Sequence, residues 1–147
     1  ANAKMLAETL KNNGFKIYSG GTDTHLMLVD LRPFGVKGNI ASESLCRANI
    51  TCNKNGIPFD TEKPMITSGI RLGSQAATTR GFGLKEFEKV GELITKVIKG
   101  LSKNPEDNSQ IEEEVRKEVI DLCSSFPIYK NLNRWFVQYV RKVRPQL

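Results

Sequence analysis

Histidine and cysteine are scarce in this 147-residue sequence, and it contains no long apolar run. His25 is the only histidine, which excludes a multi-histidine metal site. The three cysteines, Cys46, Cys52 and Cys123, form no Cys-x-x-Cys or Cys/His cluster. We therefore expect reduced, structural thiols and no bound metal. The sequence has no run of about 18 apolar residues, the length needed to span a membrane. The first residues also lack the charged, apolar and small-residue blocks of a signal peptide. A cytoplasmic location is the expectation.

The net charge of +6 is unevenly distributed along the chain. Residues 130–147 hold five basic side chains and no acidic one, which leaves 17 basic and 16 acidic residues in positions 1–129. A nearly neutral body has no general attraction to phosphate groups. We therefore predict no nucleic-acid partner and no membrane binding by the body of the chain.

Hydrophobic periodicity predicts an α+β domain. Apolar residues recur every three or four positions in 3–13, in 87–101 and in 111–126, which is typical of amphipathic helices. Residues 15–18 and 25–31 read as an antiparallel strand pair, 37–48 as a short helix, and 50–52 and 70–73 as short strands. Residues 53–67 look like an irregular loop with a binding function. The pattern predicts a small antiparallel or mixed sheet with helices packed on one face.

Three motifs in a fixed order carry a family resemblance. They are residues 19–25 (SGGTDTH), 47–55 (RANITCNKN) and 67–73 (TSGIRLG), with supporting matches at 80–82 (RGF) and 123–129 (CSSFPIY). In this order and spacing they resemble the last third of serine hydroxymethyltransferases. The resemblance covers roughly residues 1–130 and leaves 131–147 as a basic amphipathic tail. It implies a fold similar to the C-terminal small domain of fold-type I transferases that depend on pyridoxal phosphate.

The resemblance implies an enzyme that uses pyridoxal phosphate to convert serine and tetrahydrofolate into glycine and methylene-tetrahydrofolate. In that family the cofactor forms a Schiff base with a lysine after a threonine-rich run and a histidine. Here Leu26 follows the only histidine. We therefore predict that this chain holds no catalytic residue, binds no cofactor alone and is inactive alone. The expected partners are the N-terminal cofactor-binding domain of the same enzyme and further copies in a homo-oligomer.

By resemblance, Arg71 corresponds to the arginine that binds the carboxylate of the amino-acid substrate. A planar guanidinium suits this role because it makes two parallel hydrogen bonds to a carboxylate. Asn55 corresponds to an asparagine at the pterin end of the folate site, and Lys63, Pro64 and Met65 to a loop that lines this site. The alternatives are an ion pair of Arg71 with an acidic side chain, and a turn stabilised by Asn55.

Two other features have ordinary structural explanations. Asp23 and His25 lie two residues apart, but no nucleophile motif accompanies them, so we expect no catalytic pair. Gly20 and Gly21 lie outside any phosphate-binding pattern and predict a turn.

The tail supports a second reading of the whole chain. Its apolar residues share one helical face, with basic residues on the other side; they are Leu132, Trp135, Phe136, Tyr139, Val140 and Val143. Such a segment could bind a membrane surface or a protein partner, or bind nucleic acid weakly, which would make the chain a non-catalytic interaction module. It could equally pack on its own domain or on a sister subunit. A third hypothesis is an independent binder of folate or an amino acid.

Overall fold

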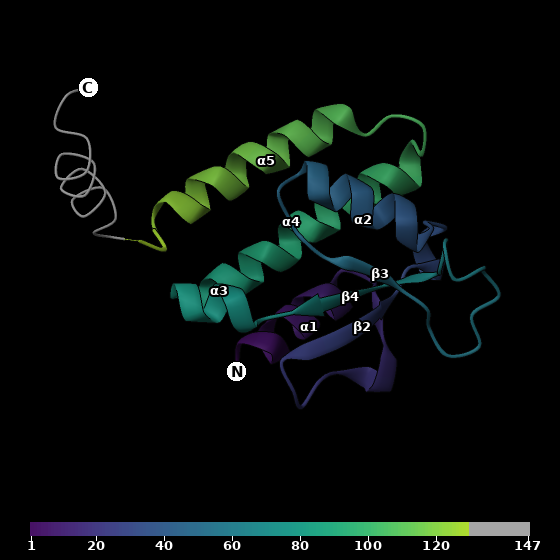
Figure 1. Ribbon diagram of the computed structural model, residues 1–147, viewed down its shortest axis with the longest axis horizontal. Helices are drawn as coiled ribbons and strands as arrows, with labels where there is room; N and C mark the ends of the chain where they lie inside the picture. The colour runs from purple at the N-terminus through teal and green to yellow at the C-terminus, as the bar shows by residue number, and fades with distance from the viewer. Residues whose placement is uncertain (130–147) are drawn as a thin grey trace, which may run out of the picture.

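The computed structural model describes residues 1–129, which form an α+β domain as predicted (Figure 1). The helices are α1 (Asn2–Asn12), α2 (Gly38–Arg47), α3 (Gln75–Arg80), α4 (Leu84–Lys103) and α5 (Ser109–Ser124). The strands are β1 (Lys16–Ile17), β2 (Leu26–Asp30), β3 (Asn53–Asn55) and β4 (Gly69–Gly73). Two short 3₁₀ turns, η1 (Tyr18–Gly20) and η2 (Arg32–Phe34), flank β2. The predicted amphipathic segment 131–147 lies outside the described residues.

The four strands form one sheet in the order β1-β2-β4-β3, and every neighbouring pair is antiparallel. The pairing of β1 with β2 confirms the predicted strand pair. The register places Arg71 of β4 between Leu28 of β2 and Asn53 of β3. Two positions along the strand, Gly69 lies between Asp30 and Asn55. Because side chains alternate between the two faces of a strand, these two rows share one face of the sheet.

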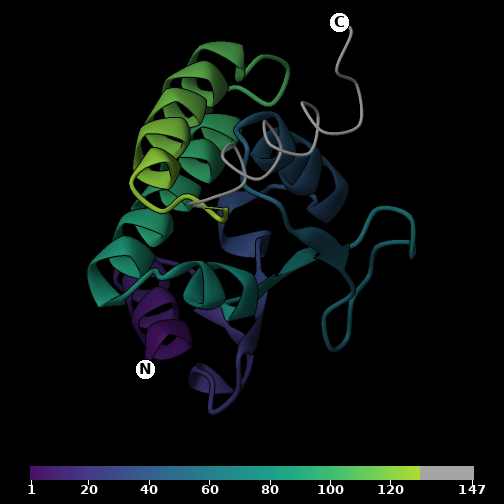
Figure 2. The same ribbon diagram turned by 60° about the vertical axis from the view of Figure 1, so that its left-hand side comes forward.

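The opposite face of the sheet is the core. Met27, Val29, Ile70 and Leu72 project from it and are at most 5% exposed. Helix α1 contacts β1 and β2, helix α2 contacts β3 and β4, and α4 packs against α1, α2 and α5. Figure 2 shows α1 and α4 together on one side of the sheet, to its left in this view. The helices therefore cover one face of the sheet, as predicted, and the row of Arg71 faces away from the core.

Helix α4 supplies much of the core because its apolar positions repeat every three to four residues. Its buried apolar side chains are Phe87, Leu93, Ile94, Val97, Ile98 and Leu101. Gly91 marks the closest approach to α1, since a Cβ built there would lie 2.7 Å from Cγ2 of Thr9. A contact below 3 Å requires movement of one of the two helices. Because Gly91 has no side chain, α1 and α4 can pack this closely.

Two local predictions were wrong. Residues 50–52 were expected to form a strand, but the backbone N–H of Ile50 donates to the Leu45 carbonyl at 2.8 Å and closes α2. Asn49 takes a positive φ of 63° to make this helix end possible. The ladder of β3 therefore begins only at Asn53, inside the stretch that was expected to be irregular. Helix α3 was not predicted at all.

None of the helices within residues 1–129 is both long and apolar enough to cross a membrane.

Candidate functional site

Arg71 lies in the middle of the open sheet face and is exposed. Within residues 1–129, its guanidinium makes no side-chain hydrogen bond and has no acidic partner within 4.0 Å. The structural alternative of an ion pair is therefore not realised in this part of the chain. A cation held on a rigid strand without a counter-charge is suited to bind an anionic group.

A cavity of about 460 Å³ opens over this face and is lined by both Arg71 and Asn55. Tyr18, Leu26 and Leu28 form its wall on the side of β2, and the turn 19–24 closes one end. The structure thus brings together the predicted carboxylate-binding and pterin-binding residues, which are 16 positions apart in the sequence. Sequence reasoning missed Tyr18, which lies in η1, and Leu28 of β2, which the sheet register places opposite Arg71.

Asn55 ends β3, half-buried, at the edge of this cavity. Its side-chain Nδ2 donates to the carbonyl of Gly56 at 2.8 Å, so one N–H of the amide stabilises the start of the following loop. This contact is the turn-stabilising role considered as the alternative. The carboxamide oxygen and the second N–H are the groups that an amide in this position can offer to a ligand. Both roles are compatible with the geometry.

The loop 56–68 follows β3 and carries Lys63, Pro64 and Met65. All three are exposed, and the Met65 side chain is 75% accessible. They do not line the cavity of Arg71, so the structure separates them from Arg71 and Asn55. Phe59 in the same loop is 96% exposed. The loop therefore presents two large apolar side chains to its surroundings.

Asp60 holds this loop in a single shape. Its carboxylate accepts hydrogen bonds from the backbone N–H groups of Ile57, Glu62 and Ser68 and from the hydroxyl of Ser68, at 2.7 to 3.2 Å. Burial alone would raise the pKa of Asp60, but the bonds from Ser68, Glu62 and Ile57 outweigh it and hold this pKa well below its usual range. A carboxylate with four donors is a firm internal brace for the loop.

Helix α2 secures the far end of the loop. The N–H groups of Gly38 and Asn39 donate to the carbonyls of Thr67 and Ile66, both at 2.9 Å. A Cβ at Gly38 would lie 2.5 Å from the carbonyl oxygen of Gly69, so only glycine fits here. The first helical turn of α2 thus positions the residues that lead into β4 and Arg71.

A charged network on the same open face joins the sheet to the loop. Asp30 is 1% exposed, and Arg32 donates to both of its carboxylate oxygens, the shortest bond being 2.7 Å. Nη2 of Arg32 also donates to the Tyr18 hydroxyl at 3.2 Å. Burial would raise the pKa of Asp30, but the hydrogen bonds and charge of Arg32, aided by Lys16, lower it. Asp30 thus stays ionised and orients Arg32.

Histidine and cysteine take no part in this site. The side chain of His25 is exposed, and its backbone carbonyl accepts the N–H of Ser74 at 2.9 Å. Asp23 lies 3.6 Å from Lys4. The cysteines are all free, and burial raises the pKa of the Cys52 thiol to about 12, so it stays protonated. Residues 1–129 contain no cluster of three or more potential metal ligands.

Comparison with known proteins identifies the family. The model of the serine hydroxymethyltransferase family matches residues 1–94. The serine hydroxymethyltransferase of Pelagibacter ubique is 88% identical over 132 residues, which cover 90% of this chain and 30% of that protein. Those of a Marinomonas species and of Paramagnetospirillum magneticum are each 64% identical over 130 and 129 residues, 88% of this chain.

The chain spans about 30% of the length of these relatives, so it corresponds to a segment of each. The match includes all three motifs of the sequence between residues 19 and 73, and these motifs build the open sheet face and its loop. The chain belongs to the serine hydroxymethyltransferase family.

Proposed function

We propose that this chain is the substrate-carboxylate and folate-loop domain of a serine hydroxymethyltransferase and that it is inactive alone. The complete enzyme would convert serine and tetrahydrofolate into glycine and methylene-tetrahydrofolate. A cytoplasmic location and assembly into a homo-oligomer are part of this proposal. They rest on the family membership.

One observation supports the proposal above all others, the position of Arg71. Its guanidinium is exposed on a braced strand, has no acidic partner within residues 1–129, and shares a cavity with Asn55. A free guanidinium can take a carboxylate in a bidentate hydrogen-bonded pair, which fixes the orientation of the amino acid as well as its charge. Asn55 lines the same cavity, where its amide can meet the donor and acceptor edge of a pterin ring.

The residues of this cavity do not fit pyridoxal phosphate as a complete site. No lysine is among the residues that line it, so no amine is in place to form a Schiff base with the cofactor aldehyde. We therefore assign cofactor binding in the complete enzyme to the part of the enzyme that this chain does not include. The contribution of this chain is to orient the substrate carboxylate and to shape the folate end.

The loop 56–68 has the properties of a folate-lining segment. Asp60 and helix α2 hold its backbone, while Lys63, Pro64 and Met65 stay exposed. A pre-shaped loop loses little conformational entropy when it meets a ligand. Because these side chains lie outside the cavity of Arg71, we propose that they contact the tail of the folate and leave the pterin ring to Asn55.

The test of Arg71 uses the complete enzyme that carries this domain. Arg71→Lys and Arg71→Ala should raise KM for serine strongly, since one charge-assisted bond contributes about 1.5–3 kcal/mol, or on the order of 10- to 100-fold. Arg116→Ala, an exposed arginine of α5, is the matched control and should leave KM unchanged. If Arg71→Ala retains the parental KM for serine, the assignment of Arg71 to the substrate carboxylate is wrong.

The test of inactivity uses the chain alone. Mixed with pyridoxal phosphate, it should develop no visible absorption band that borohydride removes, and it should not convert serine into glycine. Titration calorimetry should detect no binding of glycine or tetrahydrofolate at micromolar concentration. A single charged contact contributes less than the roughly 8 kcal/mol of binding free energy that micromolar affinity requires. An aldimine band would show that a lysine of this chain serves the cofactor.

A further inference from the structure

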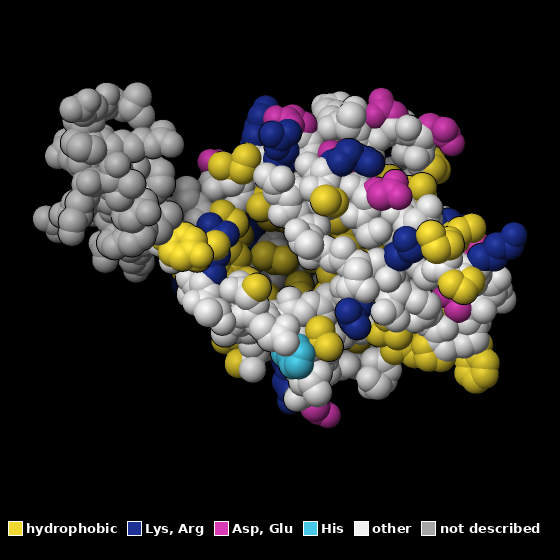
Figure 3. All heavy atoms as spheres, viewed as in Figure 1, with side chains coloured by type: hydrophobic (Ala, Val, Ile, Leu, Met, Phe, Trp, Pro, Cys, Tyr) yellow, Lys and Arg dark blue, Asp and Glu magenta, His cyan; other side chains and the backbone are white. Residues whose placement is uncertain are grey.

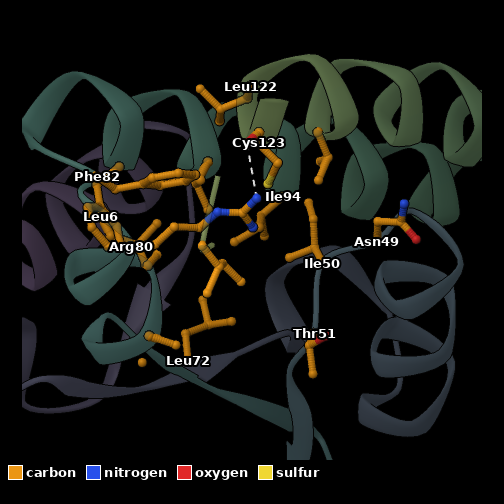
Figure 4. Close-up of a pocket in the computed structure, with 17 residues that line it drawn as sticks. Leu6, Asn49, Ile50, Thr51, Leu72, Arg80, Phe82, Ile94, Leu122 and Cys123 are labelled. Carbon is orange, nitrogen blue, oxygen red and sulfur yellow. Dashed lines mark hydrogen bonds between the residues drawn. The ribbon is translucent and has the colours of Figure 1, made fainter. Parts of the chain in front are cut away.

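A second cavity, of about 300 Å³, lies on the helical side of the molecule between β4, α3, α4 and α5. Figure 3 shows it as a hollow with hydrophobic side chains on its floor, and Figure 4 shows the side chains that line it. Most of the lining is apolar and includes Ile50, Leu72, Ile94, Val119 and Leu122. No residue of the proposed catalytic site lines this cavity, so the proposed function leaves it unexplained.

Arg80 fixes the path of the chain where it leaves α5 beside this cavity. Its Nε donates to the carbonyl of Phe126 at 2.6 Å. Its Nη2 donates to the carbonyl of Cys123 at 3.0 Å, as Figure 4 shows. The ring of Phe126 packs on Phe82, with 4.9 Å between the ring centroids. Ile128, two residues further on, lines the cavity and is 65% exposed. The described chain therefore ends at the rim of an apolar hollow.

The sequence that follows this rim matches the hollow in chemistry. Residues 130–147 place Leu132, Trp135, Phe136, Tyr139, Val140 and Val143 at helical spacing, with five basic and no acidic residues. Four acidic side chains of α5, Glu112, Glu113, Glu114 and Glu118, already pair with basic residues of α2, α4 and α5, so the match with the segment rests on its apolar face. Trp135 comes seven residues after Ile128, and a chain of this length can reach roughly 20 Å. The chain between Ile128 and Trp135 is therefore long enough for Trp135 to reach the cavity.

We propose that the cavity is the docking site for segment 130–147 of the same chain, with aromatic side chains of the segment entering between α3 and α5. The apolar face fills the hollow, and the basic face stays in water. Burial of apolar surface drives the contact. This inference is independent of the proposed catalytic role, because it rests on different residues.

Trp135 is the only tryptophan of the chain, so its fluorescence reports on the segment alone. In the full 147-residue chain we expect a blue-shifted emission and protection from acrylamide. Ala76 is exposed on α3 and lines the mouth of the cavity. Ala76→Arg places a cation there, so the emission should move to that of free tryptophan in water. Thr79→Arg adds the same charge to the same helix outside the lining and should leave the emission unchanged.

Two further measurements complete the test. Circular dichroism of both variants must match the parent chain, since surface positions on α3 tolerate such changes. Truncation after Tyr129 should increase the binding of anilinonaphthalene sulfonate, because the hollow loses its cover. A parent emission equal to that of free tryptophan, or an emission that Ala76→Arg leaves unchanged, overturns the proposal. So does a protected Trp135 found only in dimers by sedimentation, because the segment would then dock on a second copy.

Discussion

The hydroxyl of Tyr18 donates a hydrogen bond to the carbonyl of Pro58 at 2.9 Å, across 40 positions of sequence. Arg32 donates to the same hydroxyl at 3.2 Å, so the phenol accepts on one side and donates on the other. The buried carboxylate of Asp30 fixes Arg32 in turn. A chain of oriented groups thus runs from the sheet to the loop 56–68 and holds it at Pro58, a position that Asp60 does not contact.

Removal of this hydroxyl should loosen the loop and leave the domain folded. In Tyr18→Phe we expect faster hydrogen exchange at the amides of residues 57–62, with a change in global unfolding free energy of no more than about 1 kcal/mol, as for one exposed hydrogen bond. Tyr129→Phe removes a hydroxyl from another exposed tyrosine and is the matched control. If the exchange rates in Tyr18→Phe equal those of the parent, Asp60 and α2 are sufficient to hold the loop without the Tyr18 hydroxyl.

The loop should also respond to acid through Asp60. Its pKa lies below the ordinary value of 3.8, so its contribution is complete above that value and is lost as the pH falls through the lowered pKa. Exchange of the loop amides should therefore accelerate below about pH 4 relative to the intrinsic rate. Asp60→Asn should show loop opening at neutral pH and no further acid-dependent step. An acid transition that persists in this variant would assign the response to another carboxyl.

Arg47 and Glu112 form a second joint, between α2 and α5. Arg47 donates to both carboxylate oxygens of Glu112 at 2.6 and 2.7 Å, and Ser44 donates at 2.6 Å. Hydrogen bonds from Arg47 hold the pKa of Glu112 below its usual range. Arg47→Ala leaves a carboxylate that is only 6% exposed with one donor, so we expect a loss of about 1–3 kcal/mol in urea unfolding.

A matched control for this joint is Arg116→Ala, which breaks an exposed pair with Glu113. Pairs of this kind contribute less than about 0.5 kcal/mol, so the unfolding midpoint should hardly move. Because the pKa of Glu112 is lowered, the effect of Arg47→Ala should be largest near neutral pH and shrink as Glu112 becomes protonated in acid. An effect of equal size at all pH values would point to lost packing of the arginine stem.

The contact between α1 and α4 predicts that Gly91 tolerates no side chain. Gly91→Ala would bring its Cβ to 2.7 Å from Cγ2 of Thr9, and overpacking of this kind costs about 1–3 kcal/mol. The higher helix propensity of alanine offsets up to about 1 kcal/mol of that loss. Thermal unfolding should therefore show a lower midpoint. Gly56→Ala, where the nearest atom is 3.9 Å away, is the control and should remain neutral. A midpoint unchanged in Gly91→Ala would mean that α1 shifts freely.

The sequence predicted the long helices well because α4 and α5 repeat their apolar residues at a helical period over several turns. The sequence-based prediction failed for short elements, whose structure depends on only a few residues. Helix α3 is six residues long and has little periodicity. At residues 50–52, β-branched residues favoured a strand, but the N–H of Ile50 was needed to end α2. Asn108 directly precedes α5, but its side chain donates to Ser44 and to the Val97 carbonyl and does not cap the helix.

For the site, the sequence predicted individual residues but not how they are arranged. Motif resemblance predicted Arg71 and Asn55 individually, but only the register of β3 against β4 shows that their cavity is shared. The partners Tyr18, Asp30 and Arg32 come from another strand pair, and nothing in their spacing connects them to Pro58. Contacts between distant segments depend on the packing of the whole sheet, which local patterns do not encode.

The exposure of Arg71 also bears on how such a domain can change over time. Since its guanidinium supports no other group within residues 1–129, replacement of this residue should leave the melting temperature almost untouched. A screen that selects variants for folding yield would therefore be blind to losses at this position. Conversely, substitutions that stabilise the helical side of the domain could accumulate without changing which substrate the site binds.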